Sequence, residues 1–343
     1  MRRRSLRLIV VLTVAGVAFQ AARAAVLVNG AGATFPYPIY SKWFDEFHKR
    51  NPDVQINYQS IGSGGGIRQV TDGTVDFGAS DGPMTEEQLA ATKVPILHLP
   101  TVLGAVVPTF NLAGVETLRF TPEILAGIFL GKVTRWDDAA IVQANPGVKL
   151  PAQAIVPVHR SDGSGTTYVF TDYLTKVSPE WASTAGKGTA VNWPVGIGGK
   201  GNEGVTGLVK QTPNTIGYVE LVYAVQNKLP VCAVRNRSGR FVEASLDSIT
   251  AAAASAASNM PADFRVSITD AAAADAYPIA SFTWLLVPTR IKDAEKGRAM
   301  KDFLAWMLVD GQKLAPALQY APLPEAVIGL ERQALDRITV GAT

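Results

Sequence analysis

Short runs of apolar, β-branched residues alternate along the chain with longer stretches in which apolar residues recur every three or four positions. Residues 26–35 (VLVNGAGATF) predict a strand that ends in a turn, and four aromatic residues at 40–47 follow at helical spacing behind Pro36. Residues 54–63 and 66–73 repeat this order, with glycines between strand and helix. The alternation predicts an α/β protein with a mostly parallel sheet covered by helices on both faces. Ligands of such sheets bind outside the carboxyl ends of the strands.

Two later runs resemble each other. Residues 101–111 (TVLGAVVPTFN) and 281–290 (SFTWLLVPTR) are both apolar, rich in β-structure formers and interrupted by Val-Pro-Thr. They are either two core strands of one domain or two crossings between lobes. The second interpretation predicts a first lobe made of both chain ends, 25–104 plus 281–343, and a second lobe at 105–280.

Two further helices are expected. The alanine-rich stretch 250–260 has high helix propensity and predicts a solvent-facing helix. Residues 299–311 (AMKDFLAWMLVDG) predict an amphipathic helix that packs against the first lobe and is capped by Gly311.

The first 24 residues have the pattern of a secretory signal peptide. A basic start is followed by an apolar run at about 8–19 and by Ala-Arg-Ala ending at Ala24. The alternative, a membrane anchor, requires roughly 18–20 continuous apolar residues, and this run is shorter. We therefore expect residues 1–24 to be a signal peptide that is removed on export.

Charge and cysteine content exclude several classes of protein. Residues 1–24 contain five arginines and no acidic residue, so the remaining chain has 27 basic and 29 acidic residues and a net charge of −2. This balance gives no support for a nucleic-acid partner. The single Cys232 forms no intrachain disulfide and is expected in the core, and three separated histidines do not suggest a zinc site.

Three clusters of glycines and hydroxyls follow predicted strands and precede predicted helices. They are GAGATFP at 30–36, IGSGGGI at 61–67 and RSDGSGTT at 160–167. Each offers free backbone N–H groups at the positive end of a helix dipole. In any one cluster a hydroxyl that caps its own helix is sufficient explanation. Together, with the fixed charge of Arg160, the three clusters could hold a single anion.

Several catalytic and nucleotide-binding motifs are not matched. Phe35 stands where a dinucleotide fingerprint has its third glycine, and no stretch has the phosphate-loop pattern GxxxxGK[ST]. Ser164 lacks the G-x-S-x-G elbow, and His159 is too near in sequence for easy pairing as its base. A secreted serine-dependent phosphatase or esterase that uses Ser164 remains the alternative to a binding protein.

Seven stretches together resemble the periplasmic phosphate-binding proteins of bacterial phosphate ABC transporters. They occur in the same order as in that family, from about residue 25 to 330, and are GAGATFPYPIYSKW, YQSIGSGGGIRQV, VDFGASDGPM, FLGKVTRWDD, RSDGSGTTYVFTDYL, WPVGIGGKGNEGV and TIGYVE. The resemblance implies a two-lobed α/β fold, the type II periplasmic-binding-protein fold with a two-strand hinge. It also implies a periplasmic, monomeric, non-enzymatic protein without a cofactor, which binds inorganic phosphate and delivers it to the permease subunits of an inner-membrane ABC transporter.

The resemblance also implies the residues that bind phosphate. Asp162 would orient Arg160, and Lys200, although basic, is not part of the expected site. One position departs from the family, because Gly64 stands where a second serine is common, and we expect this change to affect loop stiffness more than ligand contacts. The implied phosphate-binding residues are Thr34, Phe35, Ser63, Asp81, Arg160, Ser164, Gly165 and Thr166.

Asp81 has two interpretations. It is either a turn residue after a strand or the acceptor of the proton that phosphate carries near neutral pH. Sulfate has no such proton and would leave the carboxylate unpaired, and roughly 4 kcal/mol of penalty corresponds to about thousand-fold discrimination. A binding protein for another oxyanion would share the fold and lack this selectivity.

Overall fold

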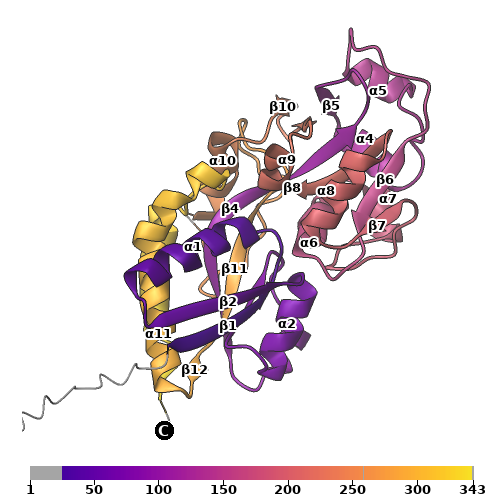
Figure 1. The fold of residues 1–343 in the computed structure, drawn as a ribbon. Helices are drawn as coiled ribbons and strands as arrows, with labels where there is room; N and C mark the ends of the chain where they lie inside the picture. The colour runs from indigo at the N-terminus through magenta and orange to yellow at the C-terminus, as the bar shows by residue number, and fades with distance from the viewer. Residues whose placement is uncertain (1–24, 258, 342–343) are drawn as a thin grey trace, which may run out of the picture.

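Eight strands form one continuous sheet in the order β2-β1-β3-β11-β4-β8-β6-β7. The computed structural model describes residues 25–257 and 259–341, so the predicted signal peptide lies outside the described residues. Helices surround the two ends of the sheet and give two lobes stacked along one axis (Figure 1). The first lobe contains β2, β1, β3 and β11, and the second contains β8, β6 and β7.

One long strand takes part in both lobes. From Ile96 to Ala105, β4 (Ile96–Asn111) pairs with β11 (Ala280–Pro288), and from Val106 to Asn111 it pairs with β8 (Thr215–Glu220). All residues of β4 between its two ends are buried. The lobes therefore meet where Ala280 of β11 pairs with Ala105 of β4.

The first lobe is built on parallel strands and a cluster of aromatic side chains. The aromatic residues of α1 are buried as their helical spacing predicts, and Phe44 contacts Phe303 of α11 with ring centroids 5.3 Å apart. Helix α2 packs on β1 and β3, and α11 packs on β1. The elements of this lobe are β1 (Val26–Gly32), α1 (Tyr37–Arg50), β2 (Val54–Ser60), α2 (Ser63–Asp72), β3 (Phe77–Ser80), α3 (Glu86–Ala90), β12 (Arg290–Ile291), α11 (Ala294–Trp306), α12 (Glu325–Leu335) and β13 (Thr339–Val340).

The second lobe places helices around β6 and β8, and it also contains a small sheet of order β10-β9-β5. Trp136 and Trp181 are fully buried in its core, and Cys232 is buried as expected. Its elements are β5 (Leu118–Phe120), α4 (Pro122–Phe129), α5 (Ala139–Ala144), β6 (Val156–Arg160), α6 (Gly165–Val177), α7 (Pro179–Thr184), β7 (Ile197–Gly199), α8 (Gly201–Gln211), α9 (Leu221–Gln226), β9 (Cys232–Arg235), β10 (Phe241–Val242) and α10 (Leu246–Ala257).

The sheet is mostly parallel, as predicted, but the pairs β3–β11, β11–β4 and β4–β8 at its centre are antiparallel. Two other expectations need correction. Helix α10 forms as predicted but is not simply solvent-facing, because Ile249, Ala252 and Ala253 are fully buried and the helix packs on β11 and β4. Helix α11 continues into a π-helix at Met307–Gly311, and Gly311 has a φ of −59°, so it is not a left-handed cap.

Among the described helices, none is long and apolar enough to cross a membrane.

Candidate functional site

The three glycine and hydroxyl clusters meet where the two lobes face each other. Gly64 of the second cluster donates its N–H to the carbonyl of Gly163 in the third cluster at 2.9 Å. A Cβ placed on Gly165 would lie 2.3 Å from both Ser63 Oγ and Asp81 Oδ2 of the other lobe. The first cluster joins them through Thr34, whose hydroxyl contacts Asn202 of the second lobe at 2.7 Å. Groups far apart in sequence thus come together where the lobes meet, and we call this junction the cleft.

Free backbone donors indicate that an anion binds at this junction. Thr34 and Phe35 follow β1, and Ser63 begins α2. Gly165 and Thr166 form the first turn of α6. Within the part of the chain that the structure describes, no group accepts a hydrogen bond from the N–H of any of these five residues. Since buried N–H groups are normally paired, five of them around one site predict a ligand that accepts hydrogen bonds.

Arg160, at the end of β6, contributes a buried positive charge. Its side chain is 1% exposed and forms a two-pronged ion pair with Asp162, with Nε 2.8 Å from Oδ1 and Nη2 2.6 Å from Oδ2. Asp162 also accepts the N–H of Gly201 at 3.0 Å. Burial alone would raise the pKa of Asp162, but the hydrogen bonds from Arg160 outweigh it and lower that pKa. The charged pair therefore holds the guanidinium in a fixed plane.

The hydroxyl oxygens of Ser63 and Ser164 both accept hydrogen bonds from the backbone. Ser164 Oγ accepts the N–H of Thr167 at 3.0 Å and so caps α6. Ser63 Oγ accepts the N–H of Asp81 at 3.2 Å. Capping and ligand binding are thus compatible, since a hydroxyl can accept and donate at once.

Asp81, just after β3, is an acceptor among these donors. Its Oδ1 accepts the hydroxyl of Thr283 at 2.7 Å. Its Oδ2 is buried and has no hydrogen-bond partner among the described residues. Burial raises the pKa of Asp81 to about 7, against the opposing effects of Thr283 and Arg160. A proton shared between this carboxylate and a ligand oxygen would satisfy the free Oδ2.

Three residues that contact the predicted site residues were not predicted from the sequence. Asn202 contacts Thr34, Thr283 holds Asp81, and the hydroxyl of Tyr223 donates to the carbonyl of Thr34 at 2.6 Å. Of these three residues, only Asn202 could have been found from the sequence. Its motif GGKGNEG, like the three clusters, lies between a strand and a helix. Lys200 in the same motif is exposed.

The serine-hydrolase alternative finds no support in the geometry. Ser164 Oγ is engaged at the start of α6, and the ring of His159 stacks on Trp193 with centroids 4.9 Å apart. The Nδ1 atom of His159 lies 3.0 Å from the carbonyl oxygen of Arg160. Within the described residues, no group of three or more His, Cys, Asp or Glu side chains is arranged to hold a metal ion.

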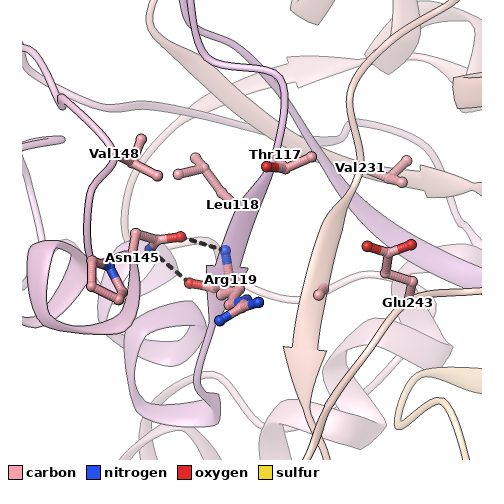
Figure 2. A pocket seen from close by; sticks show the side chains of 9 residues that line it. Thr117, Leu118, Arg119, Asn145, Val148, Val231 and Glu243 are labelled. Carbon is pink, nitrogen blue, oxygen red and sulfur yellow. Dashed lines mark hydrogen bonds between the residues drawn. The ribbon is translucent and has the colours of Figure 1, made fainter.

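A separate cavity of about 240 Å³ in the second lobe is lined by residues of the paired strands β5 and β9 and of the loop that follows α5 (Figure 2). Asn145 bonds both backbone groups of Arg119 there, accepting the N–H at 2.7 Å and donating to the carbonyl at 3.0 Å. The side chain of Asn145 and the backbone of Arg119 therefore satisfy each other.

Comparison with known proteins identifies the family of this chain. Residues 20–310 match the family described as PBP superfamily domain. The chain is 48% identical over 305 residues to the phosphate-binding protein PstS of Xylella fastidiosa strain Temecula1, which covers 88% of this chain and 83% of that protein. It is 45% identical over 303 residues to PstS of Pasteurella multocida, covering 88% and 87% respectively. The fold resembles that of a high-affinity periplasmic phosphate-binding protein solved with phosphate, with a TM-score of 0.72, 22% identity, and coverage of 89% of this chain and 93% of that one.

Proposed function

This chain belongs to the PBP superfamily and to its family of phosphate-binding proteins, PstS, and from this premise we propose that it binds inorganic phosphate and delivers it to a membrane ABC permease for import. The observation that carries the proposal is the set of free N–H and O–H donors around Asp81 Oδ2. A tetrahedral anion that still carries one proton matches many donors and one acceptor. The relatives are binding proteins, which agrees with a function without catalysis.

The proposed phosphate-binding residues are those that the family resemblance implies. The N–H groups of Thr34, Phe35, Gly165 and Thr166 would donate to phosphate oxygens, and so would the side chain of Arg160. The hydroxyls of Thr34, Ser63, Ser164 and Thr166 would do the same, and Asp81 would accept the proton of the ligand. Burial of all these groups supports high affinity, because hydrogen bonds to an ion are stronger where water is excluded.

The proposed mechanism is capture by closure. The lobes, 25–104 plus 281–343 and 105–280, would separate about β4 and β11 as a two-strand hinge, and phosphate would bind one set of donors before the other closes over it. The closed surface would then be the one that the permease subunits recognise. We further propose that residues 1–24 export the protein to the periplasm, where it acts as a monomer.

Calorimetric titration tests this function. The protein without residues 1–24 is freed of ligand by partial unfolding and dialysis, then titrated at neutral pH with phosphate and separately with sulfate. Tight one-to-one binding of phosphate with negligible heat from sulfate is expected. Equal binding of sulfate would point to another oxyanion as the ligand, and binding of neither would overturn the proposal. Loading of the permease is tested by stimulation of its ATPase activity, which only the phosphate-bound protein should produce.

A further inference from the structure

The amide of Asn202 lies between two hydroxyls of the proposed phosphate site. Its Nδ2 is 2.7 Å from Thr34 Oγ1 and 3.1 Å from Thr166 Oγ1. Thr34 belongs to the first lobe, whereas Thr166 and Asn202 belong to the second. All three side chains are buried. A single side chain therefore contacts both halves of the cleft.

The orientation of this amide is determined by its third partner. Asn202 Oδ1 accepts the N–H of Glu220 at 2.9 Å, and a peptide N–H can only donate. The oxygen must therefore face Glu220, and the NH₂ group must face the two threonines. Glu220 is itself fixed at the end of β8, where its carboxylate accepts the N–H of Val222 at 2.7 Å.

This orientation constrains the hydroxyl protons. A threonine hydroxyl has one proton and two acceptor sites. Thr34 Oγ1 accepts a hydrogen bond from Nδ2 of Asn202 and a second one, at 3.3 Å, from the backbone N–H of Asn202. Thr166 Oγ1 accepts from the same Nδ2 and, at 3.3 Å, from Nη1 of Arg160. With both acceptor sites in use, each hydroxyl can only donate its proton, and the unprotonated oxygens of a bound anion are the matching acceptors.

We propose that Asn202 is a positioning residue that directs the hydroxyl protons of Thr34 and Thr166 toward the bound anion. For Thr34 it does so only when the lobes are closed, because the two residues belong to different lobes. Closure then does more than cover the ligand: it converts the Thr34 hydroxyl from a group that could donate or accept into an obligatory donor. The inference deepens the proposed function and rests on it, since the anion is taken to be phosphate.

A double-mutant cycle read out by phosphate titration separates this role from simple packing. Asn202→Ala should weaken phosphate binding about tenfold to hundredfold, because two hydroxyl donors lose their fixed direction. In a background carrying Thr34→Val and Thr166→Val, which have no hydroxyls to direct, the same change should weaken binding less than about threefold. Equal effects in both backgrounds would overturn the inference.

A second variant of nearly identical shape guards against a folding defect. Asn202→Asp can still accept the N–H of Glu220, but its other oxygen accepts from the threonine hydroxyls and turns their protons away from the ligand. It should bind phosphate at least tenfold more weakly than the alanine variant. Binding as tight as that of the unchanged protein would show that only the shape of Asn202 matters and would overturn the inference.

Asn145 provides a matched control. Like Asn202 it is a buried asparagine of the second lobe; its side chain makes three hydrogen bonds, all to backbone groups, and it lines the separate cavity (Figure 2). Asn145→Ala should lower the stability of the protein and leave the phosphate dissociation constant unchanged within about twofold. If the unchanged protein bound no phosphate, the proposed function itself would fail, and the inference with it. Additive effects in a protein that does bind phosphate would remove the inference alone.

Discussion

At the scale of single residues, Asp81 is expected to make anion selectivity depend on pH. Phosphate brings its own proton to Oδ2, whereas sulfate can bind only if Asp81 is itself protonated. Because burial raises the pKa of Asp81 to about 7, that protonated form is lost above pH 7. Sulfate affinity should therefore fall about tenfold per pH unit between pH 7 and 9, while phosphate affinity stays nearly constant. Competition titrations across this range measure both.

Asp81→Asn is the corresponding variant. Its amide can donate to either anion at any pH, so the preference for phosphate over sulfate should weaken and lose its pH dependence. The proton argument would be contradicted if sulfate binding to the unchanged protein were independent of pH. It would also be contradicted if Asp81→Asn left the preference for phosphate over sulfate unaltered.

Gly165 is expected to be required for closure. A Cβ there would lie 2.3 Å from Ser63 Oγ and Asp81 Oδ2, which belong to the opposite lobe. Gly165→Ala should therefore weaken phosphate binding about tenfold to hundredfold, the effect of 1–3 kcal/mol of overpacking. The stability of the ligand-free protein should change by no more than about 1 kcal/mol.

Gly207→Ala is the control for that substitution. Gly207 lies in α8 of the same lobe, and a Cβ there would have no atom within 4 Å. Phosphate affinity should be unchanged, and chemical denaturation should show equal or slightly higher stability. An undiminished affinity of the Gly165→Ala variant would indicate that the two lobes do not approach as closely when phosphate is bound.

At the scale of elements, the start of α6 is expected to serve stability and binding together. Ser164→Ala removes the hydroxyl that accepts the N–H of Thr167 and caps α6. The free energy of unfolding should therefore fall by about 1 kcal/mol, and the affinity for phosphate should fall as well. Ser178 caps α7 in the same way, accepting from Trp181 at 3.2 Å, but lies outside the cleft. Ser178→Ala should lower stability alone. Denaturant unfolding measures the stability of both variants, and titration measures their affinity for phosphate. If Ser164→Ala left phosphate affinity unchanged, Ser164 would have only a structural role.

The elements that local pattern determines were the ones that the sequence could predict. The pattern of a short apolar run followed by a glycine-rich helix start predicted β1, β2 and β6 and the three clusters that follow them. This was possible because turn chemistry and helix capping depend on neighbouring residues. The buried face of α10 could not be predicted, since small alanines pack closely against β11 and β4 without a marked apolar pattern. The antiparallel centre of the sheet likewise depends on pairing between segments more than 100 residues apart.

Contacts between side chains that are far apart in the sequence could not be predicted for the same reason. Thr283 meets Asp81 over a separation of 202 residues, and Asn202 meets Thr34 over 168. Gly64 was expected to affect loop stiffness, but its N–H bonds Gly163 and a Cβ there would lie 3.1 Å from Gly163 Cα. Its lack of a side chain therefore allows the lobes to approach, a property that local sequence does not contain.

At the scale of the whole molecule, these contacts predict a change of shape on binding. The hydrogen bonds from Gly64, Asn202 and Tyr223 span the two lobes, and they can form only when the lobes are together. Without phosphate, the buried charges of Arg160 and Asp81 and the free N–H groups favour an open, hydrated cleft. Small-angle scattering should thus show the radius of gyration decreasing on addition of phosphate, toward the value of about 20 Å typical of a compact chain of this length.

The same scattering experiment on Gly165→Ala ties the shape change to the cleft. At a phosphate concentration that saturates the variant, its lobes should remain further apart than those of the unchanged protein, because the added methyl group meets Asp81 and Ser63 before the interlobe hydrogen bonds form. Gly207→Ala should compact fully. If the unchanged protein bound phosphate without any compaction, closure would not accompany capture. The permease would then have to distinguish loaded from empty protein by something other than the distance between its lobes.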